Sequence, residues 1–342
     1  MSDGNRVIDA IIASMRIVMA LMLALPLHAQ VSGFALLRAA TEDEAVTSQV
    51  QVGLDWRPSM TLGAHVHLLG RTNSDGSRRG HAGVVEAWLD QKLERGEHRF
   101  RFMEGAFFLP GTRENVDALW ESPYTISSSA LTSWLGEELR PIGVDASYTL
   151  RRRWTIGATA FRGNDTFGSL PAVRGWRRHD RWTLLGEHVP VNPEYYTSVS
   201  AENDGRIGWS ARGRFQTDRT TLQAIHIDNR SDALEYGELA NWLTRFDIAS
   251  FDFTSGDWIF ISEGGYGYTD IEVEGVRYRT KLRTAYVMAS RRLGNARASL
   301  RAETYDHGRA VTAAYFFTRG KARLGAEARS DGRVVVEVRY YF

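Results

Sequence analysis

A short stretch of the chain concentrates charged side chains of both signs. They lie between positions 109 and 138 and at the start of the element that follows: Arg113, Glu114, Asp117, Glu121, Glu137, Glu138 and Arg140. Charges that converge in a narrow, partly dehydrated passage act on ions far more strongly than charges on an open surface. If the fold encloses this stretch, it is the best candidate for selecting charged solutes. The alternative is an ordered surface loop whose charges are solvated.

Basic residues recur at alternate positions elsewhere in the chain, which predicts that they share one face of their strands. We assign to this water-facing wall Arg99, Arg101, Arg206, Arg212, Arg214, Arg277, Arg279, Lys281, Arg283, Arg291, Arg297, Arg301, Lys321, Arg323, Arg329, Arg333 and Arg339. The acidic residues on the same face are fewer: Glu97, Asp145, Glu303, Glu327 and Glu337. Because a ladder of Arg and Lys raises the local anion concentration, such a wall predicts a preference for anions or acidic solutes. The alternative is that some of these Arg lie at strand ends and meet lipid headgroups.

Other chemistry has little support in the sequence. The chain has no Cys, which removes disulfides, thiol catalysis and thiolate metal sites. His65 and His67 share one face of a predicted strand, but two His alone do not make a metal site. There is no Gly-x-Ser-x-Gly elbow, and a formal net charge of +1 argues against general nucleic-acid binding. We therefore expect no cofactor, no metal site and no enzymatic activity.

The one long apolar run lies near the N-terminus and is typical of a signal peptide. Arg16 precedes an apolar core at 17–25, and a small residue, Ala29, closes the segment. The run is too short to span a bilayer as a helix. We predict cleavage after Ala29, with Met15 as an alternative start, and a single domain over 30–342.

The rest of the chain alternates between apolar and polar residues. In the last predicted strand, one face carries Val334, Val336, Val338, Tyr340 and Phe342, and the other carries Arg333, Val335, Glu337, Arg339 and Tyr341. A soluble sandwich would also alternate. However, the strands are long enough to cross a membrane at a tilt, the apolar faces include many Ala, and the polar faces carry long Arg and Lys. These features favour a transmembrane antiparallel β-barrel.

The predicted strands are 31–39, 46–56, 59–70, 80–92, 97–108, 139–151, 153–163, 206–217, 219–229, 241–254, 257–270, 276–292, 296–306, 310–319, 321–330 and 332–342. Their number, sixteen, is even, as single-chain bacterial barrels require. Every second connection is tight and rich in turn residues, and the long connections 109–138 and 164–205 fall in the other set. A further strand pair at 181–189 and 195–201 would give eighteen strands. Within the first long connection, 127–139 could form a short helix capped by Ser127, Ser128 or Ser129.

With these features the chain resembles the porins of Gram-negative outer membranes. The resemblance rests on the leader, the strand count, the alternating connection lengths, the long third loop and the aromatic-rich last strand. It implies that the third loop folds toward the lumen and narrows the pore. It also implies that Val338, Tyr340 and Phe342 form the signal read by the barrel-assembly machinery. A compact acidic motif of the general porins is not found in the loop, so their pore residues are not transferred to it.

The resemblance implies an outer-membrane channel for passive diffusion of small hydrophilic solutes. The surroundings of such a channel are outer-membrane lipid and lipopolysaccharide, and a homotrimer is compatible with it. Two other classes stay open from the sequence: a barrel enzyme of the phospholipase or protease type, and a structural or adhesion barrel with a blocked lumen.

Overall fold

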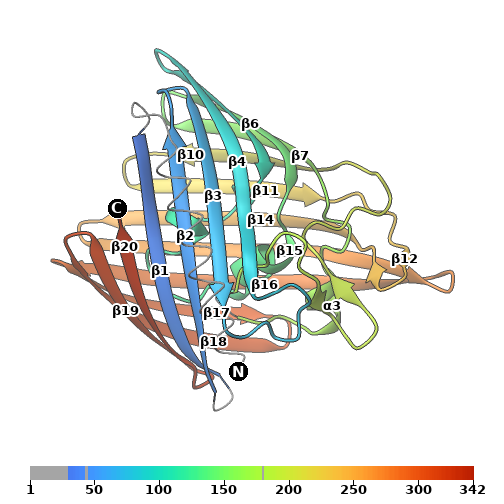
Figure 1. The fold of residues 1–342 in the computed structure, drawn as a ribbon. Coiled ribbons are helices and arrows are strands. Elements are labelled where there is room, and N and C mark those ends of the chain that lie inside the picture. The colour runs from blue at the N-terminus through green and yellow to red at the C-terminus, as the bar shows by residue number, and fades with distance from the viewer. Residues whose placement is uncertain (1–29, 43–44, 179–180) are drawn as a thin grey trace.

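The computed structural model describes residues 30–42, 45–178 and 181–342. In this part of the chain, sixteen strands pair antiparallel in chain order and form one closed barrel. The barrel closes where the first strand pairs with the last, with Phe34 opposite Tyr341 and Arg38 opposite Glu337 (Figure 1). The expected leader and its cleavage site after Ala29 lie outside the described residues and stay a prediction.

The barrel strands are β1 (Gln30–Glu42), β2 (Ala45–Arg57), β3 (Leu62–Arg71), β4 (Ala82–Arg95), β5 (His98–Ala106), β6 (Ile142–Leu150), β7 (Trp154–Arg162), β10 (Gly208–Gln216), β11 (Thr220–Asp228), β14 (Leu243–Ser255), β15 (Trp258–Val273), β16 (Val276–Leu293), β17 (Ala296–Tyr305), β18 (Gly308–Arg319), β19 (Ala322–Arg329) and β20 (Val334–Tyr341). Each matches one predicted strand to within four residues at either end, so the sixteen-strand prediction is confirmed. The short turns fall where the sequence placed them, and Gly294 and Gly320 supply the positive φ that two of them need.

The alternative of eighteen strands is wrong. The segment after β7 contributes only β8 (Val189–Pro190) and β9 (Tyr196–Thr197). These join β12 (Glu235–Tyr236) and β13 (Leu239–Ala240) in a small separate sheet. The physical reason is that the apolar residues of this segment, including Trp182 and Leu184, are buried inside the barrel rather than turned to its outer surface.

The last strand shows how the sequence divides the two faces of the wall. Val334, Val336, Val338 and Tyr340 are exposed on the outside of the barrel, whereas Val335, Glu337 and Arg339 are buried inside it. The same alternation continues across the neighbouring strands, where Leu324 pairs with Val338 and Tyr315 pairs with Ala326. Exposed apolar side chains therefore form a continuous outer surface, as contact with lipid requires.

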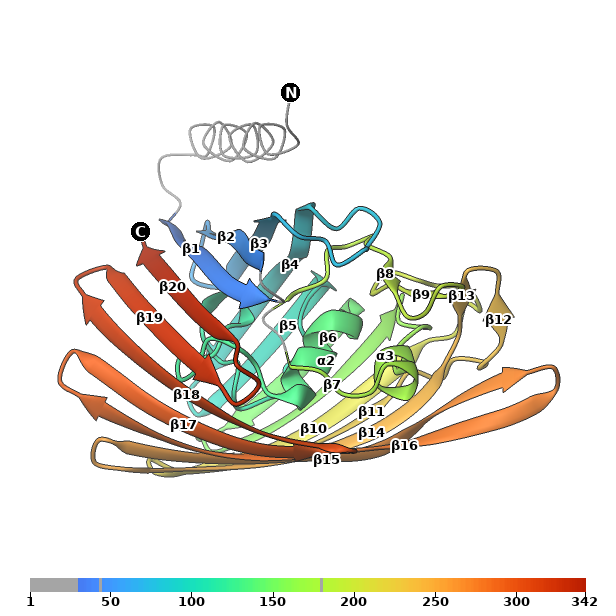
Figure 2. The ribbon, with the colours of Figure 1, turned by 90° about the horizontal axis from the view of Figure 1, so that it is seen from below.

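The connection between β5 and β6 is the long third loop, at 107–141. It contains a 3-10 turn (η1, Ala118–Trp120) and helix α2 (Ala130–Glu138). Helix α2 lies inside the ring of strands (Figure 2). Ser129 caps α2 by accepting the Thr132 N–H, as one of the sequence alternatives stated. The connection between β7 and β10 carries the five-residue helix α3 (Ser169–Val173). Among the described residues, no helix has both the length and the apolar character needed to cross a membrane.

Candidate pore constriction

The third loop crosses the lumen and is held by carboxylates of the barrel wall. Glu263 accepts from the Thr112 hydroxyl and the Arg113 N–H, both at 2.9 Å. Glu303 accepts the Ala130 N–H at 2.7 Å, and Glu327 accepts the Ile126 N–H at 2.6 Å. Because buried backbone N–H groups need acceptors, these carboxylates fix the path of the loop through the lumen.

Acidic residues of the loop pair with arginines of the wall. Arg301 donates to Glu114, and also to the carbonyls of Ser127 and Ser128 at 2.8 and 3.0 Å. Asp117 accepts from Arg339 at 3.1 Å. The structure thus brings together predicted loop residues and predicted wall residues. It also shows that Arg301 and Arg339 are buried in ion pairs rather than open to the lumen.

Glu121 forms the centre of another buried cluster of polar side chains. It accepts from Arg38 at 2.8 Å, from Gln51 at 3.1 Å and from the Trp182 indole N–H at 3.2 Å. His67 in turn contacts the Gln51 side-chain oxygen at 2.8 Å. Burial raises the pKa of the Glu121 carboxyl, and the charges of Arg38 and Arg339 oppose this shift.

The other predicted loop residues, Glu137, Glu138 and Arg140, do not join these clusters. Glu138 accepts the Gly168 and Leu170 N–H groups at 3.0 and 3.1 Å, and Glu137 pairs with Arg174 at 3.0 Å. Arg140 donates to three backbone carbonyls, those of Val85, Gly136 and Thr183. These three side chains fasten the third loop to the connection after β7 and to the wall.

Five predicted wall residues face the wrong way. Arg277, Arg279, Lys281 and Arg283, together with Arg291, lie on the outside of β16. The apolar residues of the same strand point inward: Leu282 packs in the core around α2, and Tyr286 contacts Glu263. The sequence analysis exchanged the inner and outer faces of β16, because a lumen filled by a loop buries apolar side chains as a protein core does. Arg283 pairs outside the wall with Asp306 at 3.2 Å.

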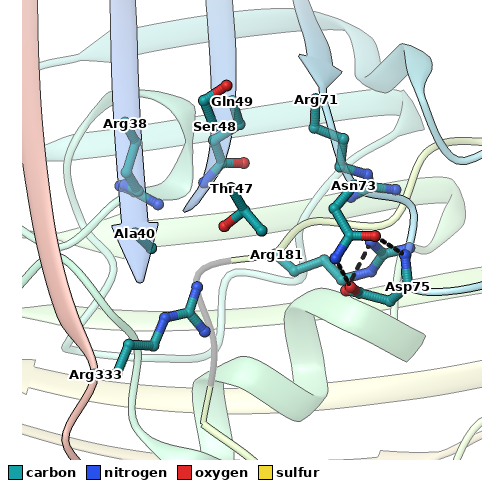
Figure 3. Close-up of a pocket in the computed structure, with 10 residues that line it drawn as sticks. All are labelled: Arg38, Ala40, Thr47, Ser48, Gln49, Arg71, Asn73, Asp75, Arg181 and Arg333. Carbon is teal, nitrogen blue, oxygen red and sulfur yellow. Dashed lines mark hydrogen bonds and ion pairs between the residues drawn. The ribbon is translucent and has the colours of Figure 1, made fainter. Parts of the chain in front are cut away.

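A small cavity of about 50 Å³ lies on the long-loop side of the lumen. Four arginines line it, each from a different part of the chain: Arg38 from β1, Arg71 from β3, Arg181 from the connection after β7, and Arg333 beside β20 (Figure 3). Among the described residues, Asp75 is the only acidic one in its lining, and it accepts from Arg181 at 3.2 Å.

A larger cavity of about 780 Å³ lies on the short-turn side. The predicted wall residues Arg99, Arg101, Arg212 and Arg214 line it, and so do the loop residues Arg113 and Asp117. Arg323, another predicted wall residue, instead donates to the Pro123 carbonyl at 2.8 Å. We name the two spaces the outer cavity and the inner cavity.

Buried side chains separate the two cavities. Along β2, Gln49 lines the outer cavity and Asp55 the inner one, and Gln51 between them is fully buried. Along β3, Arg71 and His65 line the two cavities, and His67 between them is fully buried. Glu121 and Trp182 complete this layer from the two inserted connections. We call Gln51, His67, Glu121 and Trp182 the closing layer.

Sequence reasoning missed Arg38, Arg71 and Trp182. Arg38 shares the inward face of β1 with Phe34, Leu36 and Ala40, so the sequence predicts an apolar face here. Arg71 is the last residue of β3. It follows a shift in the register between β3 and β4, at His67 and Leu68. A signal for Trp182 was present, because an apolar segment inside a long outer connection must be buried somewhere.

One acidic cluster lies in the loops. Carboxylate oxygens of Asp165, Glu202 and Asp204 lie within 4.8 Å of one another. Each already accepts a backbone N–H, from Asn203 to Asp165 at 2.6 Å and from Gly163 to Glu202 at 2.8 Å, for example. These bonds explain the cluster without a ligand, and the expectation of no metal stays a prediction.

Solved structures share this architecture at low sequence identity. The outer membrane channel DcaP of Acinetobacter baumannii is 13% identical and superposes with a TM-score of 0.58, covering 92% of this chain and 97% of that one. OmpF of Salmonella typhi, in complex with daunomycin, is 11% identical with a TM-score of 0.57 and the same coverage. A loop-deletion form of OmpT, an outer membrane protein of Vibrio cholerae, is 11% identical with a TM-score of 0.54, covering 92% of this chain and all of that one. No family model matches the chain, and no curated protein does.

The fold and the inserted third loop define the class. The chain has the fold of a porin-like β-barrel with sixteen strands.

Proposed function

We propose that the chain is an outer-membrane channel through which small hydrophilic solutes diffuse passively, with a preference for anions. The observation that carries the proposal is the charge around the lumen. Counted over the residues that the structure describes, the outer cavity has four arginines against one carboxylate. The inner cavity has six Lys and Arg, namely Lys92, Arg99, Arg101, Arg113, Arg212 and Arg214, against four carboxylates, namely Asp55, Glu86, Glu94 and Asp117. Among the residues that line either cavity, basic side chains outnumber acidic ones, which favours anions.

Conduction requires the closing layer to separate. Two of its members, Gln51 and His67, belong to the rigid wall, whereas Glu121 and Trp182 belong to inserted connections. Displacing the third loop breaks the contacts of Glu121 with Arg38 and Gln51 of the wall but none of the strand pairing. Opening can therefore leave the barrel intact.

A second candidate function is a closed barrel with a structural or adhesive role. The complete burial of the closing layer favours it. Recording from the full-length protein in a planar lipid bilayer separates the two functions. Discrete conductance steps support the channel. A well-folded sample that inserts without conductance contradicts the channel and supports the closed barrel.

The remaining expectations from the sequence stay predictions. They are the lack of enzymatic activity, the association with lipopolysaccharide and the barrel-assembly machinery, and a homotrimer. The assembly signal is one of them. Phe342 closes the barrel through backbone hydrogen bonds with Gly33 at 2.9 and 3.1 Å, and its ring lies against Gly33, where a Cβ would come within 2.3 Å of it.

A further inference from the structure

The inner cavity contains one corner in which positive charge is not balanced. Three guanidinium groups meet there: Arg113, Arg212 and Arg214, all lining the cavity. Arg212 pairs with Asp145 at 2.5 Å, and Arg113 pairs with Asp252 at 2.7 Å. Arg214 has no ion pair in the described part of the chain. Within that part it donates to the Thr155 hydroxyl at 3.4 Å, and its Nε has no hydrogen-bond partner.

The strand register shows what surrounds Arg214. It lies opposite Thr155, which lies opposite Thr149, and Arg99 is the next residue in this row. The row above it reads Arg212, Gly157, Ser147 and Arg101. Small side chains therefore form a floor between two pairs of arginines, whose backbones are three strand spacings, roughly 14 Å, apart.

The part of the floor beside Arg214 is formed by Thr155 and Thr149, which line the cavity. Gly157 is essential to this arrangement, since the Arg212 guanidinium carbon lies only 2.5 Å from where a Cβ at position 157 would be. Arg212 can thus cross β7 and reach Asp145 on β6. The hydroxyls of Thr149 and Thr155 lie 2.9 Å apart and face the cavity as further polar groups.

The loop side of the same cavity includes apolar side chains. Val116, Ala118 and Trp120 of the third loop line it, and Val116 is 48% exposed there. Trp88 on β4 adds a second indole, with the Arg101 guanidinium 5.5 Å from its ring centre. A cavity of this size, with a few polar groups on one side and apolar surface on the other, matches an organic ligand.

The geometry points to a binding site for small organic carboxylates in the inner cavity. The carboxylate accepts from Arg214 and the Thr155 hydroxyl, and the apolar body extends into the cavity toward the apolar side chains of the third loop. This inference deepens the proposed function, on which it rests, by naming the class of solute that the channel takes.

Binding of hexanoate to the detergent-solubilised full-length barrel, followed by saturation-transfer NMR, tests the site without requiring conduction. We expect hexanoate to bind and the uncharged hexanamide to bind at least tenfold more weakly. Arg214→Gln should weaken hexanoate binding about tenfold, the equivalent of one charge-assisted hydrogen bond, and Arg214→Lys should restore most of it. Arg297→Gln is the matched control, because Arg297 is also an inward Arg at the short-turn end but lies on β17, outside the cavity lining.

Equal hexanoate affinity in the wild type and Arg214→Gln overturns the site, as does equal affinity for hexanoate and hexanamide. Circular dichroism of each variant shows that it is folded. If the protein binds hexanoate through Arg214 but never conducts in a bilayer, the channel proposal fails and the site stands. If it conducts anions but does not bind hexanoate, the site fails and the channel stands.

Discussion

The ion pair between Arg301 and Glu114 should be the strongest single anchor of the third loop. Both side chains are completely buried. Replacing Arg301 with Met leaves the Glu114 charge buried, with Glu303 also in the neighbourhood at 3.4 Å from the lost guanidinium. It also removes the donors to the carbonyls of Ser127 and Ser128. Breaking a buried ion pair from one side costs about 3–5 kcal/mol, so Arg301→Met should lower the free energy of unfolding by that amount.

A double-mutant cycle measures the pair itself. Glu114→Gln should cost less, about 1–3 kcal/mol, because Arg301 keeps Glu303 as a partner. In Arg301→Met/Glu114→Gln the two charges disappear together, and the loss should fall short of the sum of the single losses by about 1–3 kcal/mol. Urea titration of the barrel in lipid vesicles, followed by tryptophan fluorescence, gives each value.

The control is Arg283→Met, which removes an outward, 65% exposed arginine from its pair with Asp306. It should change the free energy of unfolding by less than about 1 kcal/mol. Additive losses in the cycle, or an equal loss in Arg283→Met, would refute the assignment of Arg301 to the buried anchor and of Arg283 to the outer face.

Three further predictions test the closing layer, the loops and the end of the barrel. A Cβ at Gly83 would lie 3.7 Å from the Leu184 Cβ, a separation suited to a disulfide, and the chain has no Cys of its own. The oxidised Gly83→Cys/Leu184→Cys variant should therefore stay closed in bilayer recordings and open on reduction. Equal conductance in both states would contradict a moving connection. Burial raises the pKa of Asp165 to about 6, so the folded state binds the proton more tightly than the unfolded state. The free energy of unfolding should therefore fall as the pH rises from about 4 to about 6. Asp165→Asn should remove this pH dependence from the midpoint of urea unfolding, and an unchanged pH dependence would contradict the prediction. Deletion of Phe342 should leave little assembled barrel in the membrane; substituting the buried Arg339 with Ala should instead give assembled but less stable barrel, and identical yields of heat-modifiable barrel on gels would contradict the distinction.

The strands could be predicted from the sequence because their alternation has a direct physical cause. Lipid outside and a polar interior impose a period of two residues, and β20 shows it most clearly, with Val336 and Val338 outside and Glu337 and Arg339 inside. The helix in the third loop was also predictable, because Ser129 caps an apolar stripe that includes Leu131 and Leu135.

The inside of the barrel was harder to predict, because alternation separates two faces without saying which one is enclosed. On β16 the apolar face is enclosed, since Leu282 packs beside the inserted loop, and the basic face with Arg283 is outside. Ion pairing adds a second difficulty. Arg301 and Arg339 face inward as predicted, but their charges are bound to Glu114 and Asp117. Sequence alone does not show which loop carboxylates reach the wall.

The reversal potential of single channels in a salt gradient tests the central claim most directly. The full-length protein is inserted in a planar bilayer with more potassium chloride on one side, and the voltage of zero current is read. The net positive linings of the outer and inner cavities predict a sign that reports chloride as the more permeant ion. A sign that reports preference for potassium would contradict an anion-preferring channel.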